Sequence, residues 1–498
     1  MHKIILSILL ALSCFAISYA NDDIWVNECP ELKFHRVNTT DVEVVEWSNH
    51  NYKSVEIPET IVYDGETLTV VGIGKNAFFD WTALETITIP RTVTYIGESA
   101  FYNCKALKDI TVPNEVTVLA EGVFKDCSGL EYIHIPNSII DINRYAMSGC
   151  CSLKEFTIPE SVKTIGECAF YQCSAIEKIT IPESVNSLGE CVFQGCLSLK
   201  EINLSHSIKE IPLGCFWECN SLETLVIPNN VEWWENNATE KCSNLKNIIF
   251  EDGESPLVFG QKRRATTYTA FSNDVPAEVY IGRPISNFST SGLGRKITKV
   301  ICGSYFREIP MGFCKFCKEL QEFTSEYEIS RIGESAFYYC EKLTTLNIKK
   351  PIYTEIESNC FSNCELLESF EIPSSVTSIG NAAFYNCKGL QKITAFPVIP
   401  PAYYYGEYDS DDSSYVFEGV DKKTCILVVP DESLALYKNA DIWRDFFNIQ
   451  SSGIEDVVMD SENATPIYYD LGGRVIASPQ NGIYIKKQGR KSTKVFIP

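Results

Sequence analysis

A unit of 23 residues repeats along most of this chain of 498 residues. It reads Ile-Gly-x-x-Ala-Phe-x-x-Cys-x-x-Leu-x-x-Ile-x-Ile-Pro, and residues 96–113 are a nearly complete copy. Repeats of this length are typical of solenoids, in which each unit is one coil that buries its apolar side chains only against the neighbouring coils. The repeat therefore predicts a solenoid and favours a scaffold over an enzyme. Its Ile-Gly position falls at Ile73, Ile96, Leu119, Ile142, Ile165, Leu188, Ile211, Trp234, Ile309, Ile332, Ile356 and Ile379.

Each coil is expected to contain one short strand. The segment 107–112 alternates apolar and polar residues, as a half-buried strand does, and Pro113 then ends it because proline lacks an N–H donor. Stacked coils align these strands into a parallel sheet on one face of the solenoid. A phenylalanine also recurs once per coil and predicts an aromatic column in the core, at Phe78, Phe101, Phe124, Phe170, Phe193, Phe216, Phe337, Phe361 and Phe384.

Cysteines follow the same period, which argues against an ordinary disulfide framework. A small side chain with a weak S–H donor suits a tight turn, where it can donate to a main-chain carbonyl and stay apolar. Neighbouring coils are close enough for disulfides, but parallel Cβ vectors favour free, buried thiols. Cys168 and Cys191 share a second slot and are the pair to test for a bridge. The predicted structural ladder comprises Cys104, Cys127, Cys150, Cys173, Cys196, Cys219, Cys242, Cys317, Cys340, Cys364 and Cys387.

The exposed side of the predicted sheet carries a row of alternating charges and a row rich in threonine. Opposite charges on neighbouring strands attract weakly, and a slip by one coil would align like charges. Tyr132 and His134 differ in type from the residues of the two rows, and they are therefore candidate residues of a recognition surface, although both also fit an ordinary solvated surface. The charged row reads Glu85, Lys108, Glu131, Lys154, Glu177, Lys200, Glu223 and Lys246.

The repeat has irregular regions at its ends and one in the middle. We expect an N-terminal cap over residues 21–72 and the solenoid over 73–450, because open arrays need polar caps. One coil is enlarged near 251–273, yet the core position continues at Ile248, Val279, Val300 and Phe323. The C-terminal cap is expected over 400–450, with a closing helix over 434–447. Residues 451–498 lack the repeat and predict a small β module.

Tyrosine and aspartate cluster between residues 400 and 412, in the expected C-terminal cap. Such a segment suits either a solvated loop or a loop that binds a protein or glycan. No EF-hand spacing is present, and the sequence predicts no metal ion and no cofactor. The candidate binding residues of this segment are Tyr403, Tyr404, Tyr405 and Tyr408.

Charge and the N-terminal segment bear on partners and location. The net charge of −22 makes nucleic acid an unlikely partner, since acidic surfaces repel phosphates. Residues 1–20 predict a signal peptide cleaved near Ala20, with acylation of Cys14 as a lipoprotein as the alternative. No later stretch is apolar for long enough to predict a membrane span.

With the repeats laid out, the chain resembles the BspA-like (Treponema-type) leucine-rich-repeat proteins of Bacteroidetes-type bacteria, over roughly residues 50–450. The resemblance implies a leucine-rich-repeat right-handed superhelix that is secreted or exposed on the cell surface. It also implies binding to extracellular or cell-surface proteins, including host matrix proteins and other cells, without catalysis. Residues 469–475 and 481–484 resemble the C-terminal sorting domains of type IX secretion substrates, although the ending at 494–498 departs from that pattern.

Two other classes of function remain open in the sequence. An enzyme is disfavoured because the few histidines are scattered and no H-E-x-x-H, G-x-S-x-G or phosphate-binding motif is present. A carbohydrate-binding surface is suggested by the tyrosines at 403–408 and by Trp233 and Trp234. A periplasmic scaffold would share the fold and the export signal but not the exposure at the cell surface.

Overall fold

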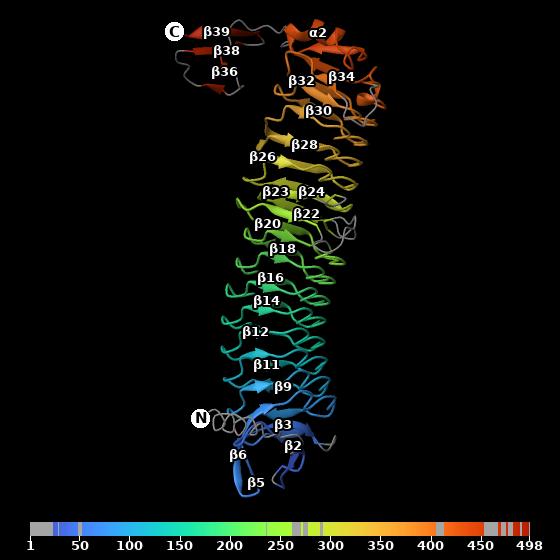
Figure 1. Cartoon of the computed structure of the whole chain (residues 1–498). Coiled ribbons are helices and arrows are strands. Elements are labelled where there is room, and N and C mark those ends of the chain that lie inside the picture. Colours follow the sequence, from blue (N-terminus) through green and yellow to red (C-terminus); the bar gives the residue numbers. More distant parts are fainter. Residues whose placement is uncertain are drawn as a thin grey trace, which may run out of the picture.

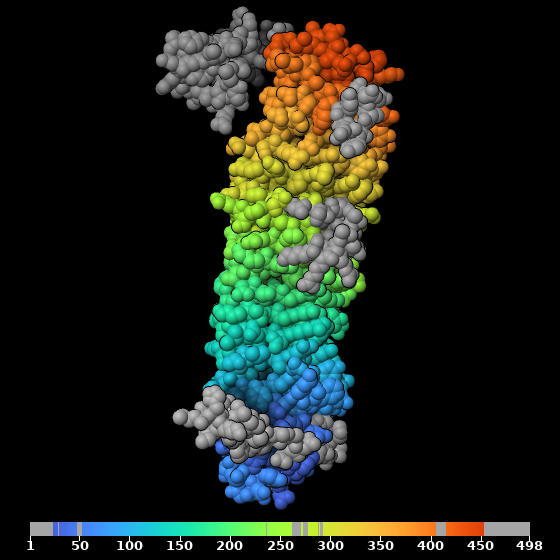
Figure 2. Space-filling model, in the orientation of Figure 1, coloured from blue at the N-terminus to red at the C-terminus, as the bar shows by residue number. Residues whose placement is uncertain are grey.

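The computed structural model describes residues 23–27, 29–47, 52–235, 237–260, 270–271, 277–288, 292–404 and 413–452, together with four strands of the C-terminal tail. Its coils stack in sequence order from the N-terminal cap upward (Figure 1). Figure 2 shows them as one column of packed atoms. This architecture confirms the predicted repeat solenoid.

The predicted strand is present on one side of the stack in nearly every described coil, the exception being the coil at 153–159, where the segment is irregular. The pairing between successive strands is parallel. We call this side the strand face. Its strands are β4 (Ser54–Glu56), β7 (Thr86–Thr88), β9 (Asp109–Thr111), β11 (Tyr132–His134), β14 (Lys178–Thr180), β16 (Glu201–Asn203), β18 (Thr224–Ile227), β20 (Asn247–Phe250), β22 (Ala277–Ile281), β24 (Ile297–Cys302), β26 (Glu322–Ile329), β28 (Thr345–Pro351), β30 (Ser369–Ile372), β32 (Lys392–Ala395), β34 (Ile426–Val429) and β35 (Asn448–Ser451).

A second, shorter strand lies on the return path of each coil, around the Ile-Gly position. Gly97 shows why glycine suits this corner: an added Cβ would lie 2.6 Å from the main-chain nitrogen of Lys75 in the preceding coil. The short strands are β8 (Tyr95–Ile96), β10 (Val118–Leu119), β12 (Asp141–Ile142), β13 (Thr164–Ile165), β15 (Ser187–Leu188), β17 (Glu210–Ile211), β19 (Trp233–Trp234), β21 (Leu257–Phe259), β23 (Ile285–Phe288), β25 (Glu308–Ile309), β27 (Arg331–Ile332), β29 (Glu355–Ile356), β31 (Ser378–Gly380) and β33 (Ala402–Tyr404).

The enlarged coil leaves the stack continuous. Ile248 of β20 pairs with Val279 of β22, and Val279 pairs with Val300 of β24. Val300 in turn pairs with Phe323 of β26. The predicted core register therefore continues through this region at these positions.

The phenylalanine column forms the centre of the core. The rings of Phe78 and Phe101 lie 5.1 Å apart and nearly parallel, and those of Phe101 and Phe124 lie 5.5 Å apart. Aromatic rings in offset contact bury a large apolar area and hold a preferred orientation. Met147 and Cys314 take the phenylalanine slot in two coils, and both are fully buried.

The cysteines of the ladder are buried and unbridged. Ten of the eleven thiols donate a hydrogen bond to the main-chain carbonyl of the residue in the phenylalanine slot of the preceding coil. Cys168 and Cys191 are also free thiols, and they hydrogen-bond to each other. The cysteine of each of these coils therefore links two neighbouring coils by a hydrogen bond to a main-chain carbonyl, without forming a disulfide.

The N-terminal end carries a mixed sheet in place of a regular coil. Its order is β1-β2-β3-β6-β5, and β6 also pairs with β8 of the first regular coil. Ser54–Glu56 forms the degenerate strand β4 and pairs with β7. The other strands of this sheet are β1 (Asp23–Trp25), β2 (Leu32–Arg36), β3 (Asp41–Trp47), β5 (Thr60–Tyr63) and β6 (Glu66–Ile73).

The C-terminal end differs from the prediction in its helix. The 3₁₀ segments η1 (Ser413–Phe417) and η2 (Asp431–Ser433) precede helix α2 (Leu434–Asn439), which ends well before 447. Ala440 is extended and Ile442 has a positive φ of 60°, and Trp443 is buried with its indole N–H donating to the carbonyl of Pro401 at 2.9 Å. The chain leaves the helix early because this buried tryptophan requires a turn.

The tail contains the expected strands in an antiparallel sheet of order β37-β36-β38-β39. They are β36 (Ile467–Tyr469), β37 (Val475–Ile476), β38 (Gly482–Gln488) and β39 (Lys491–Ile497). Residues 1–20, including Cys14 and Ala20, and the tyrosines Tyr405 and Tyr408 lie outside the described residues.

Candidate functional site

The strand face is held together by ion pairs between coils. In the alternating row, each of three lysines reaches the glutamate of the preceding coil, and all six side chains are largely exposed. Exposed pairs of this kind contribute little individually but keep the face electrically balanced. They are Lys154–Glu131 at 3.4 Å, Lys200–Glu177 at 2.8 Å and Lys246–Glu223 at 2.9 Å.

Tyr132 and His134 lie together on β11, at alternate positions of one strand and therefore on the same side of it. Tyr132 is 51% exposed, and His134 Nε2 lies 3.9 Å from Asp109 Oδ1 of the preceding coil. The structure thus places these two predicted residues side by side on the strand face, at the surface.

Tyr403 and Tyr404 lie elsewhere, on β33, which pairs with β31 on the short-strand side. Tyr403 packs partly buried against the core. Burial, followed by the nearby carboxylates of Glu357 and Glu355, raises the pKa of Tyr404 to about 12. The residues predicted from the sequence therefore do not form one site, since these two tyrosines belong to a different side of the solenoid from Tyr132.

A groove that the sequence analysis missed opens on the strand face between β28 and β30. These successive strands belong to separate sheets: β28 ends the sheet that begins at β18, and β30 begins the sheet that ends at β35. The space between them has a volume of about 370 Å³. This lies within the range of sites that enclose a ligand or a side chain. We call it the strand-face groove.

The lining of the strand-face groove combines apolar and polar side chains. Tyr353 and Phe370 are buried, Leu346 and Ile348 are partly buried, and Phe396 is 47% exposed. Large apolar groups at the surface around a concave site mark places where proteins bind other molecules. The polar residues of the lining supply hydrogen-bonding groups around this apolar centre and are Thr345, Asn347, Ser369 and Glu371.

One signal in the sequence could have located the groove. The repeat positions Ile332 and Ile356 are 24 residues apart, whereas the neighbouring steps are 23. The extra residue falls after Leu346, in the coil that contains β28. An inserted residue alters how a strand meets its neighbour, and here it coincides with one of the points where the strand-face ladder divides. The ladder also divides between β7 and β9 and between β16 and β18, in coils of regular length.

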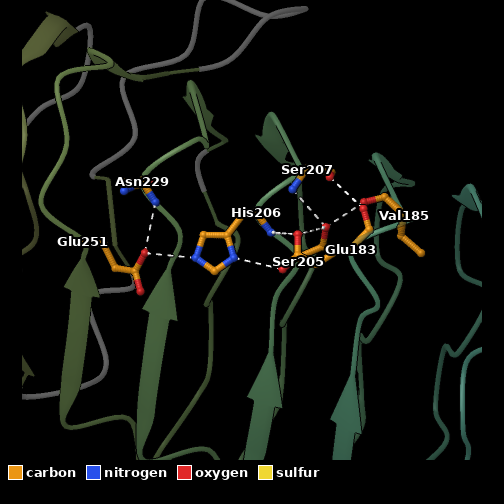
Figure 3. A network of polar contacts seen from close by, with 7 residues as sticks. All are labelled: Glu183, Val185, Ser205, His206, Ser207, Asn229 and Glu251. Atoms are coloured by element: carbon orange, nitrogen blue, oxygen red, sulfur yellow. Dashed lines mark hydrogen bonds and ion pairs between the residues drawn. The ribbon is translucent and has the colours of Figure 1, made fainter. Parts of the chain in front are cut away.

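A second polar cluster joins three coils around His206 (Figure 3). Its imidazole lies between two carboxylates, with Nδ1 at 2.9 Å from Glu183 Oε1 and Nε2 at 3.6 Å from Glu251 Oε2. The hydrogen bond from Glu183 raises the pKa of His206, and the same contact lowers the pKa of Glu183. We call these three residues the His206 cluster.

The serines beside His206 are engaged with other groups. Ser205 occupies the slot that proline takes in most coils, and its hydroxyl donates to the carbonyl of Val185 at 2.9 Å. The hydroxyl of Ser207 donates to the carbonyl of Glu183 at 2.7 Å. Neither of these hydroxyl groups donates to the imidazole of His206. The geometry is therefore that of ion pairs between coils and not that of a serine activated as a nucleophile.

Two searches of the described part of the chain bear on metals and membranes. No group of three or more histidine, cysteine, aspartate or glutamate residues is arranged there to hold a metal ion. Of the helices described, none has the length and apolar character needed to cross a bilayer.

Comparison with known proteins places these features in a family. The sequence matches the BspA type leucine rich repeat region in six copies, over residues 40–177, 141–257 and 293–400. A comparison with curated proteins gave no match.

Solved structures with the same architecture come from several bacteria. A leucine-rich repeat protein from Bacteroides ovatus is 25% identical, with a TM-score of 0.50, and the match covers 84% of this chain and 98% of that one. A leucine rich cell surface protein from Faecalibacterium prausnitzii is 22% identical, with a TM-score of 0.38, over 87% and 96% of the two chains. Since the family match spans more than half of its length, the chain belongs to the BspA-type leucine-rich-repeat family.

Proposed function

We propose that this protein is an exported, non-catalytic scaffold at the cell surface that binds another protein through the strand-face groove, and so attaches the cell to host matrix or to other cells. The observation that carries the proposal is the groove itself, a concave site between β28 and β30 in which large apolar side chains lie among polar groups. Proteins with BspA-type repeats are of the cell-surface type, which supports the proposed location.

The groove suits an extended segment of a partner protein that carries a large apolar side chain. Phe396 and the partly buried Leu346 and Ile348 offer an apolar centre from which water would be displaced on binding. The polar groups of Asn347 and Ser369 lie in the same lining and offer hydrogen bonds to a partner's main chain. Apolar centres with polar rims are the usual composition of protein interfaces.

The distribution of charged residues favours an apolar contact with the partner protein over an electrostatic one. In the coils of the alternating row, glutamates and lysines of the strand face pair with each other between coils. Glu371 is the one charged residue among those that line the groove. Binding is therefore expected to depend weakly on salt, because apolar contacts are not screened by ions.

The proposal that the protein is exported is based on the two terminal segments of the chain. Residues 1–20 are proposed to be a signal peptide cleaved near Ala20, with acylation at Cys14 as the alternative, and residues 451–498 are proposed to act as a sorting module. Proteolysis of intact cells, with an antibody to the solenoid, tests this part. Cleavage of the solenoid on intact cells is expected, whereas protection until the outer membrane is opened would assign the protein to the periplasm.

Binding is tested with the purified protein on a panel of immobilised extracellular-matrix proteins. Saturable binding to at least one member is expected, with loss in Phe396→Asp, which places a charge among the apolar side chains of the groove. Val226→Asp is the matched control, because Val226 is an exposed apolar residue of the same face outside the groove and receives the same charge. Absence of binding to every member of the panel, or equal binding by Phe396→Asp, would contradict the proposal.

A further inference from the structure

A second concave site lies on the turn segments of the solenoid, away from the strand face. It has a volume of about 410 Å³, and its lining comes from three successive coils and from η1. We call it the tyrosine pocket. Residues of the lining that matter for its chemistry are Tyr338, Tyr339, Tyr385, Tyr415, Asn359 and Asn381.

The aromatic part of the tyrosine pocket is held in place by its surroundings. The rings of Tyr338 and Tyr339 lie 4.7 Å apart in an edge-to-face arrangement. The ammonium group of Lys315 lies 5.3 Å from the ring centre of Tyr338, and that of Lys318 lies 5.8 Å from the ring centre of Tyr339. Cations held over ring faces restrict the rings, so the pocket is largely formed before any ligand arrives.

The polar part of the pocket contains an acceptor without a partner. Asn363 is nearly fully buried and engaged, since its Oδ1 accepts from Asn386 at 2.8 Å and its Nδ2 donates to Ser362 at 3.0 Å. Asn381 Oδ1 is also buried, but it makes no hydrogen bond with any described residue. Buried polar atoms are nearly always hydrogen-bonded, so Asn381 calls for a donor on a bound molecule.

The lining residues of the pocket are all uncharged. The lining itself therefore offers no charged partner to a phosphate, acidic or basic ligand, and the nearby ammonium groups of Lys315 and Lys318 lie over tyrosine rings. The lining suits a molecule with apolar C–H groups on one side, for contact with the negative faces of the tyrosine rings, and hydroxyl groups on the other, for the amides. A sugar ring has this combination.

From these observations we propose that the tyrosine pocket binds a neutral carbohydrate, with one terminal sugar ring stacked on the tyrosines and a hydroxyl donating to Asn381. A proline-rich peptide could also stack on tyrosines, but its proline rings have no donor for a buried amide oxygen. The site is separate from the strand-face groove, because its residues come from turns and from η1 whereas those of the groove come mainly from β28 and β30.

The experiment is an array of immobilised neutral oligosaccharides probed with the full chain, followed by calorimetric titration with the strongest ligand. Asn381→Ala and Tyr415→Ala are each expected to weaken binding by about tenfold or more, equivalent to ~1.4 kcal/mol. Asn381→Ala removes an atom without a partner among the described residues, and Tyr415 is 39% exposed, so both variants are expected to keep the melting temperature of the wild type.

Val226→Asp and Phe396→Asp serve as matched controls on the strand face and should bind the glycan as the wild type does. Loss of glycan binding in Phe396→Asp would assign the glycan to the groove and overturn this inference. Absence of any bound neutral glycan, or undiminished binding in both pocket variants, would also overturn it. A proline-rich peptide that binds the wild type and is lost in Asn381→Ala would assign the pocket to a peptide instead.

Discussion

The thiol of Cys127 donates a hydrogen bond to the main-chain carbonyl of Phe101, 3.0 Å away in the preceding coil. The carbonyl belongs to a tight turn and has no strand partner there. The same contact recurs in coil after coil, so the cysteine slot acts as a polar link inside an apolar core. Cysteine suits this slot because it is small, apolar and able to donate weakly.

Replacement of Cys127 by alanine should destabilise the protein. The change leaves a small cavity and removes one of two hydrogen bonds to the Phe101 carbonyl, which still accepts from the main-chain N–H of Cys104 at 3.2 Å. We therefore expect a loss of about 1–2 kcal/mol in the free energy of unfolding. Urea denaturation followed by circular dichroism measures it. Cys151→Ala is the control, since Cys151 is exposed and should change stability by less than ~0.5 kcal/mol. Equal effects of the two changes would show that the link contributes nothing.

Thiol reactivity should follow burial along the ladder. Burial raises the pKa of the Cys173 and Cys219 thiols well above the ordinary value, and only the thiolate reacts with alkylating agents. Brief treatment of the native protein with iodoacetamide should therefore modify Cys151 and leave both ladder cysteines untouched. Peptide mass spectrometry identifies the modified residues. Rapid modification of Cys173 before denaturation would contradict the buried position of the ladder.

Stability should depend on pH through the His206 cluster. The raised pKa of His206 means that its contribution is present below the unfolded value of about 6.5 and is lost as pH rises through the folded value. The lowered pKa of Glu183 means that its contribution is present above about 4.5 and is lost as pH falls. The cluster should therefore stabilise the protein most between about pH 4.5 and 6.5.

The variant His206→Gln isolates this effect. The melting temperature of the wild type should exceed that of the variant near pH 5.5, and the difference should shrink toward pH 8, where the imidazole is neutral. Glu251→Gln should reproduce part of the loss, because Glu251 faces the other ring nitrogen. A difference that is constant from pH 5 to 8 would indicate that the ion pairs do not contribute.

The alternating charges of the strand face should act through simple electrostatics. Glu177→Lys places a third positive charge between Lys154 and Lys200, so it should lower the urea midpoint more than Glu177→Gln does. The difference between the two variants should disappear near 1 M salt, where the screening length falls to about 3 Å. A difference that persists at high salt would point to packing instead of charge.

The repeat made most of the fold predictable. Because each coil packs only against its neighbours, a fixed period places Phe101, Cys127 and Ile110 in the core without knowledge of distant contacts. The same reasoning carried the register from Ile248 to Val279 across an enlarged coil. Local pattern and tertiary structure agree here because nearly all contacts are between adjacent repeats.

The sites were less predictable, for a physical reason. The strand-face groove depends on how the side chains of β28 and β30 pack where their sheets divide, which is a tertiary effect that periodicity does not report. Tyr403 was expected in a binding loop but packs against the core at the end of the short-strand ladder. The helix that begins at Leu434 ends early because burial of Trp443 outweighs local helix propensity.

The central claim, that the strand-face groove recognises an extended apolar segment, is tested most directly with a phage-displayed library of random peptides. Selection on the immobilised wild-type protein should enrich peptides that share a large apolar residue, and a fluorescent copy of the selected peptide should bind saturably. Phe396→Asp should abolish that binding, whereas Val226→Asp, on the same face outside the groove, should retain it. Selected peptides that bind Phe396→Asp as tightly as the wild type, or a selection without enrichment, would contradict the claim.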